Sequence, residues 1–182
     1  MSNPPESVYV QPKVIHNATI TLADPDPAWP DLFTREADRI TTALRRPALA
    51  VEHVGSTSVP GLAAKPIIDI ALVVADSADE AAYVPDLEAA GYVLHVREPG
   101  WHEHRLLKRE MPKIHLHVFT TGSSEVARML LFRDRLRSRP DERELYERTK
   151  RELAAQRWTH VQDYADAKSA VVEGILARGA EA

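Results

Sequence analysis

The apolar positions of this chain follow two different periods along its length. From residue 123 onward they recur at helical spacing, whereas the part before it is mostly short apolar runs between turn residues, which is typical of strands. The predicted strands are 14–22, 48–54, 67–74, 92–97, 104–109 and 113–119, and the predicted helices are 30–44, 79–90, 124–137, 141–156 and 160–178. This order predicts one α+β domain over 14–182, with a mixed sheet in front and a helical half behind. The polar, proline-bearing residues 1–13 predict a flexible arm.

One acid lies inside an apolar predicted strand. Asp69 stands in the run 67–74 among isoleucine, alanine, leucine and valine, and a carboxylate buried there needs a partner or a metal ion. Upstream lies the turn Gly55-Ser56, and turns of this kind let backbone amides approach a phosphate closely. Together, the turn and the acid predict a site for phosphate and metal. The alternative is a structural acid that pairs with Lys65 or with an arginine.

Two histidines alternate with apolar residues in the predicted strand 113–119. The period of two puts His115 and His117 on one face of that strand. Paired imidazoles can hold a transition metal or bind phosphate oxygens, and one of them can act as a base. The alternative is the solvent-facing side of a strand. We favour a functional role, because the same chain also carries an acid inside a strand.

The C-terminal helices carry cations next to aromatic rings. Tyr146 and Lys150 lie one helical turn apart, as do Tyr164 and Lys168, so each pair offers a ring for stacking and a cation for a phosphate. Arg133 is a further candidate. The alternative for these cations is a solvated charged face. A weaker cluster of aromatic and basic residues falls in a predicted loop: Trp101, His102, His104 and Arg105.

Composition narrows the classes of protein that fit this pattern. The 182 residues carry a net charge of −4, which argues weakly against non-specific nucleic-acid binding. The chain has no cysteine, so disulfides, thiolate nucleophiles and cysteine-type zinc sites are excluded. No secretory signal and no apolar run of membrane-spanning length is visible. We therefore expect a cytoplasmic protein that binds small molecules and neither a membrane nor a nucleic acid.

The signature of the GrpB-like family is similar to residues 52–70, EHVGSTSVPGLAAKPIIDI. That family also occurs as a domain fused behind bacterial dephospho-CoA kinases. Supporting similarity comes from the helix start at 29–33, the strand 115–118, the segment 132–137 and the two Tyr–Lys pairs, so the resemblance spans 20–176.

The GrpB-like family in turn resembles the nucleotidyltransferase superfamily, which has the palm-like fold of polymerase-beta-like enzymes. The resemblance implies a nucleotidyltransferase-like mixed sheet with a C-terminal helical half, and acids that hold divalent metals at a triphosphate. By position, Gly55 and Ser56 would form the phosphate-binding turn, and Asp69 would be the first metal acid. The second acid of the superfamily pattern should stand at position 71, which is Ala71 here.

The missing acid changes the expected metal. A site of Asp69, His115 and His117 suits one softer ion, so manganese and zinc stand beside magnesium as candidates. Cationic side chains would then neutralise more of the phosphate charge. The residues implied in phosphate binding are Gly55, Ser56, Thr57, Lys65, Arg133, Lys150 and Lys168, and those implied in catalysis are Lys65, Asp69, His115 and His117.

The resemblance implies a protein that binds a nucleoside triphosphate, ATP first, together with a divalent metal. It would transfer or use a nucleotidyl group on a small-molecule acceptor, and ATP-dependent activation of a carboxylate for amide formation is one form of this reaction. The alternative is a catalytically degenerate module of the same fold that binds a ligand or stabilises a partner. The sequence leaves the acceptor and the oligomeric state open.

Overall fold

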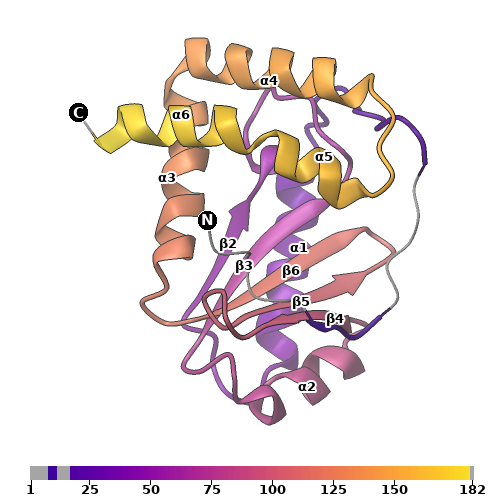
Figure 1. Cartoon of the computed structure of the whole chain (residues 1–182). Coiled ribbons are helices and arrows are strands. Elements are labelled where there is room, and N and C mark those ends of the chain that lie inside the picture. Colours follow the sequence, from indigo (N-terminus) through magenta and orange to yellow (C-terminus); the bar gives the residue numbers. More distant parts are fainter. Residues whose placement is uncertain (1–7, 12–16, 181–182) are drawn as a thin grey trace.

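A single mixed sheet forms the centre of the molecule (Figure 1). The structure, a computed structural model, describes residues 8–11 and 17–180. In this part of the chain six strands are arranged in the order β1-β4-β5-β6-β3-β2, with β3 and β6 parallel and all other neighbours antiparallel. The strands are β1 (Val8–Tyr9), β2 (Ala50–Val54), β3 (Ile68–Val74), β4 (Val93–Glu98), β5 (His104–Arg109) and β6 (Ile114–Thr120).

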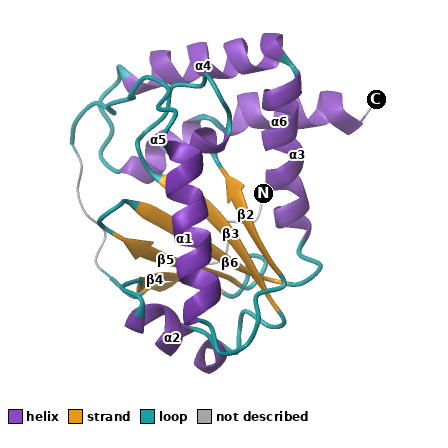
Figure 2. Ribbon diagram, turned by 180° about the vertical axis from the view of Figure 1, so that it is seen from behind, coloured by secondary structure: helices purple, strands orange, loops and turns teal. Residues whose placement is uncertain are grey.

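Helices lie on both sides of this sheet. The helix α1 crosses one face, and α2 lies near the end of α1 (Figure 2). Of the other helices, α3 lies beside β2, and α4, α5 and α6 lie around the ends of β2 and β3 (Figure 1). The helices are α1 (Trp29–Ala43), α2 (Val84–Ala89), α3 (Ser124–Ser138), α4 (Pro140–Ala154), α5 (Val161–Ala167) and α6 (Ser169–Ala180). The α+β class, the mixed sheet and the C-terminal helical half are as the sequence predicts.

The strand β3 separates two environments. Ile68, Ile70 and Leu72 are buried in the main core, where they pack with residues of α1 such as Ile40. Because side chains alternate along a strand, Asp69 points to the other face, toward the helical half. The apolar face of β3 therefore fixes the strand in the core, and its opposite face is free to carry the acid.

A second core joins the helical half to the segment that follows β2. Val59 and Leu62 of this segment are buried with Leu136 of α3, Tyr146 of α4 and Ile175 of α6. The cluster attaches the segment 55–66 to three helices at once. In the part of the chain that the structure describes, no helix is long and apolar enough to cross a membrane.

Two predicted helices are each divided in the structure. The segment 79–90 forms a short 3-10 turn (Glu80–Ala82) followed by α2, because Pro85 in the first turn of α2 has no backbone N–H to continue the preceding turn. The hydroxyl of Tyr83, between the two, donates to the carbonyl of Ser77 (2.7 Å). The segment 160–178 forms α5 and α6. They meet at Lys168, whose backbone N–H bonds to the carbonyl of Ala165.

The N-terminal predictions are tested only in part. Residues 1–7 and 12–16 lie outside the described residues, so most of the predicted arm and the start of the predicted strand 14–22 are not covered. Val8 and Tyr9 pair with β4 at the edge of the sheet. Over 17–22 there is no regular strand, and Ala18 makes an isolated bridge to Trp158. Asn17 has φ +45°, a left-handed conformation that interrupts extended backbone.

Candidate metal and phosphate site

The first part of the site is a close contact between Asp69 and Gly55. Asp69 lies opposite Val54 in the pairing of β2 with β3, so the turn that follows β2 passes directly over its carboxylate. A Cβ atom at position 55 would lie 2.3 Å from Asp69 Oδ2, and Gly55 also has φ +68°. Both the contact and the conformation therefore require glycine.

The strand β6 brings two imidazoles to the same carboxylate. In the parallel register with β3, His115 lies opposite Asp69, and His117 lies two positions further along the same face. His115 Nδ1 is 3.5 Å and His117 Nε2 is 3.7 Å from Asp69 Oδ1. One donor atom from each of the three residues lies within 4.8 Å of the other two. Ligand atoms that surround one metal ion at about 2 Å are themselves about 3–4 Å apart. Asp69, His115 and His117 can therefore bind a single cation together.

Electrostatics keep this carboxylate ionised. Burial by itself would raise the pKa of Asp69, but the neighbouring imidazoles of His115 and His117 outweigh this effect and hold that pKa below its ordinary range. Burial lowers the pKa of the His115 imidazole, and Asp69 opposes this effect. An ionised carboxylate and a neutral imidazole are the forms in which Asp69 and His115 can act as ligands.

Three lysines from three segments form the second part of the site. Lys150 of α4 donates to Ser56 Oγ (3.2 Å) and to the carbonyl of Ala63. The ammonium groups of Lys168 and Lys65 lie 4.7 Å and 5.6 Å from the centre of the Tyr164 ring. Among the described residues, none of the three lysines forms an ion pair with a carboxylate.

The pKa shifts of these lysines show that their charges are close to one another. Burial lowers the pKa of Lys65 to about 8 and that of Lys150 to about 7, and in both cases repulsion from Lys168 lowers it further. Burial also lowers the pKa of Lys168, against which the charge of Asp69 acts. A cluster of partly desolvated cations without acidic partners is stabilised by a bound anion.

Two residues that were implied in phosphate binding are engaged elsewhere. Thr57 is buried, and its hydroxyl lies 3.1 Å from His53 Nε2 and donates to the carbonyl of Ile67 (3.2 Å). The guanidinium of Arg133 contacts Glu52 Oε2 (2.9 Å) and is also hydrogen-bonded to Asp134 and to the carbonyl of His53. We therefore leave Thr57 and Arg133 out of the proposed ligand set, and treat both as supports of β2 and its turn.

Two further residues take a role at the site that the sequence did not predict. Arg137 of α3 donates twice to the carbonyl of Ser58 (3.0 and 2.8 Å) and so holds the turn from the helical side. His104, the first residue of the predicted strand 104–109, begins β5 and lies 3.1 Å from His117. Alternation along that strand gives a signal for His104, and the pairing of β5 with β6 puts it on the same face of the sheet as His115 and His117.

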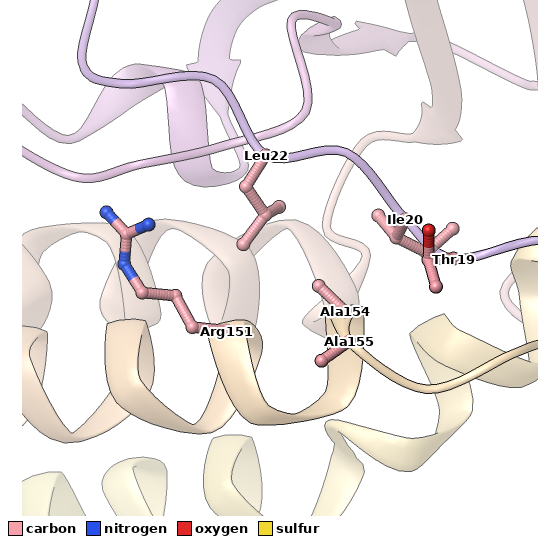
Figure 3. A pocket seen from close by; sticks show the side chains of 6 residues that line it. All are labelled: Thr19, Ile20, Leu22, Arg151, Ala154 and Ala155. Atoms are coloured by element: carbon pink, nitrogen blue, oxygen red, sulfur yellow. The ribbon is translucent and has the colours of Figure 1, made fainter.

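A shallow hollow of about 300 Å³ lies away from these residues (Figure 3). It is formed by the segment 19–22 and the C-terminal turns of α4, and its lining residues are Thr19, Ile20, Leu22, Arg151, Ala154 and Ala155. Figure 3 shows mainly short apolar side chains there, with Arg151 at one end. None of the candidate site residues contributes to this hollow, so we do not assign it to the site.

The mixed sheet, the turn over the strand acid and the helical half define an α+β protein. The chain belongs to the GrpB family, since the family model described as GrpB protein matches residues 19–178. The resemblance read from residues 52–70 is thereby confirmed.

Relatives and a solved structure agree with this assignment. A UPF0157 protein of Halalkalibacterium halodurans is 61% identical over 163 residues, which cover 90% of this chain and 84% of that protein. A UPF0157 protein of Streptomyces coelicolor is 48% identical over 163 residues, which cover 90% of this chain and 86% of that protein. The crystal structure of GrpB from Enterococcus faecalis matches with a TM-score of 0.66 and 28% identity, over 85% of this chain and 98% of that chain.

A partial match extends to a different kind of protein. The dephospho-CoA kinase of Mycolicibacterium paratuberculosis is 44% identical over 81 residues. These residues make up 43% of this chain but only 20% of the kinase. The similarity therefore concerns a limited segment of that enzyme.

Proposed function

We propose that this protein binds a nucleoside triphosphate together with one divalent metal ion, and transfers the nucleotidyl group to a small-molecule acceptor. The observation that carries the proposal is the position of Lys65, Lys150 and Lys168. They gather beside the Gly55-Ser56 turn and Asp69, and among the described residues no carboxylate pairs with them. A chain of phosphates is the type of ligand that satisfies several cations and a glycine turn together.

The donor set fits a metal ion of intermediate softness. One carboxylate and two imidazoles favour manganese or zinc over magnesium, which prefers a shell of oxygen ligands. Asp69, His115 and His117 would hold the ion, and its charge would polarise the phosphate oxygens. Magnesium remains in the test as the ion that the superfamily resemblance implies.

The proposed reaction is a displacement at the α-phosphorus. A nucleophilic atom of the acceptor forms a bond to that phosphorus, the bond to the bridging oxygen of pyrophosphate breaks, and the acceptor's proton passes to water. Lys65, Lys150 and Lys168 would neutralise the charge that gathers on the leaving pyrophosphate. With a carboxylate as acceptor the product is an acyl-adenylate, which an amine can convert to an amide with release of the nucleoside monophosphate.

Calorimetry and thermal unfolding test the proposal directly. ATP, GTP, CTP, UTP and coenzyme A are each added with magnesium, manganese or zinc to the wild type, to Asp69→Asn and to Asp38→Asn. Asp38 is a matched control because it is exposed on α1. A nucleotide at a hundredfold excess over its Kd should add about 2.7 kcal/mol to the free energy of unfolding.

We expect this stabilisation to require metal, to persist in Asp38→Asn and to be lost in Asp69→Asn. Release of pyrophosphate would then be measured with a series of carboxylate, alcohol and amine acceptors. If no nucleotide binds with any of the metals, or if Asp69→Asn binds as well as the wild type, the proposal is wrong.

A second candidate is a binding module of the same fold without turnover. Ala71 supports it, because this fully buried alanine stands where the second acid of the superfamily is expected. In that case a nucleotide or coenzyme A binds in an Asp69-dependent manner, but no acceptor gives pyrophosphate. The same calorimetry and product assay therefore separate the two candidates.

A further inference from the structure

A chain of hydrogen-bonded side chains runs behind His117, away from Asp69. Glu98 ends β4 and lies directly opposite His104, the first residue of β5. Glu98 Oε2 is 2.6 Å from His104 Nδ1, and His104 Nε2 is 3.1 Å from His117 Nδ1. The other nitrogen of the His117 ring, Nε2, faces Asp69 Oδ1 at 3.7 Å.

Hydrogen-bond chemistry sets the direction of this chain. The carboxylate of Glu98 can only accept, so His104 Nδ1 carries the proton that is donated to it. In a neutral imidazole the second nitrogen has no proton, so His104 Nε2 accepts from His117 Nδ1. It follows that a neutral His117 ring carries its proton on Nδ1 and presents the lone pair of Nε2 to Asp69.

Packing holds the middle member of the chain in place. The side chain of His104 is only 5% exposed, a setting in which the neutral imidazole is favoured. Its ring stacks on Phe119 with centroids 4.9 Å apart, and the ring of Trp101 meets it edge-on at 5.2 Å. These contacts, together with the hydrogen bond to Glu98, hold the ring of His104 with Nε2 in front of His117.

We propose that Glu98 and His104 are positioning residues that keep His117 in its Nδ1–H tautomer and aim the lone pair of Nε2 at the metal position. Without a cation, this lone pair would meet the oxygen of Asp69, and two acceptors facing each other are unfavourable. Histidine ligands of metals commonly donate their other N–H to such a partner, which fixes the ring and increases its basicity. The proposal rests on the proposed function only where it concerns the metal.

The tautomer of His117 can be measured without any metal. Protein with 15N-labelled histidine is examined by long-range 1H–15N correlation NMR, with His117 assigned by the loss of its signals in His117→Gln. The spectra are recorded at a pH at which the His117 ring is neutral, and the wild type should then show the Nδ1–H form. In His104→Phe, which retains a stacking ring but offers no acceptor, His117 should change largely to the Nε2–H form. His102→Asn is the control, because His102 is exposed and outside the chain.

A second pair of variants protects the test if His104→Phe does not fold. Glu98→Gln keeps an oxygen that accepts from His104 Nδ1, so the Nδ1–H form of His117 should survive. Glu98→Met removes the acceptor and should shift His117 toward the other form. The proposal is wrong if His117 is already Nε2–H in the wild type, or if a folded His104→Phe or Glu98→Met leaves its tautomer unchanged.

Metal titration by calorimetry gives the functional readout. Manganese and zinc should bind about 10–100-fold more weakly to His104→Phe than to the wild type, while His102→Asn should bind normally. An unchanged affinity together with a shifted tautomer would overturn the positioning role. If the wild type binds neither ion, the metal part of the proposed function fails, and the NMR experiment still decides on the tautomer.

Discussion

Position 55 accepts only glycine, both because of its backbone conformation and because of the neighbouring Asp69. Its φ of +68° and its contact with Asp69 leave no room for a side chain. Gly55→Ala should therefore combine backbone strain of about 1–3 kcal/mol, since φ +68° with ψ −174° is a conformation that essentially only glycine adopts, with about 1–3 kcal/mol of overpacking. Because the new methyl group displaces the Asp69 carboxylate, metal binding should be lost as well. Urea unfolding and metal titration measure the two effects.

Gly122→Ala is the matched control for that substitution. Gly122 has φ +79°, but a Cβ atom added there meets nothing within 4 Å. Gly122→Ala should be destabilised by the backbone strain alone, and its affinity for metal should not change. Equal destabilisation of the two variants, with metal binding intact in Gly55→Ala, would mean that the close contact with Asp69 is unimportant.

At the scale of elements, the helix α3 acts as a clamp on the turn after β2. Arg137 donates two hydrogen bonds to the carbonyl of Ser58, across the boundary between the helical half and the sheet. Arg137→Met should lower the free energy of unfolding by about 1–3 kcal/mol, because that carbonyl loses a charged donor. It should also weaken nucleotide binding, since the neighbouring Ser56 is held less firmly.

Arg148→Met controls for the loss of one positive charge. Arg148 is exposed on α4, so its replacement should change neither stability nor nucleotide affinity appreciably. Chemical unfolding and calorimetry on both variants check the prediction. Nucleotide affinity that falls equally in both variants would indicate a general effect of charge and no specific clamp.

At the scale of the whole molecule, the lysine cluster should make stability depend on pH. The ordinary lysine pKa is 10.5, whereas in the folded protein burial lowers it to about 7 for Lys150 and to about 8 for Lys65. Between these values the unfolded chain binds more protons than the folded protein. The free energy of unfolding should therefore rise as the pH increases from about 7 to about 10.

The contribution of Lys150 can be isolated by substitution. In Lys150→Met the rise in the free energy of unfolding should be smaller by about 1–3 kcal/mol, because one shifted group is removed. Lys113→Met, at an exposed position before β6, should leave the rise unchanged. Urea unfolding at several pH values measures this difference, and identical profiles in Lys150→Met and wild type would contradict it. Polyphosphate binding should weaken over the same pH range, since the lysines lose their charge.

Local patterns predicted the elements wherever one period ran without interruption. The apolar run 67–74 became β3, and the alternation around His115 and His117 became the polar face of β6. They failed over 79–90, where Pro85 stands in the first turn of α2 and separates this helix from the 3-10 turn before it. The spacing of apolar residues does not show this break, because it comes from the backbone N–H that proline lacks.

The sequence by itself determined the sheet-then-helix order, the turn with its acid, and the pair of histidines, because each depends on residues that are neighbours along the chain. Only the tertiary structure decided which side chains share the site. The register of β3 with β6 places the histidines at Asp69, and the packing of the helical half brings Lys150 and Lys168 to the turn. It also turned Thr57 into the interior and placed His104 behind His117. These contacts join residues that are distant in sequence. Which residues meet depends on how the strands and helices pack together to bury the core.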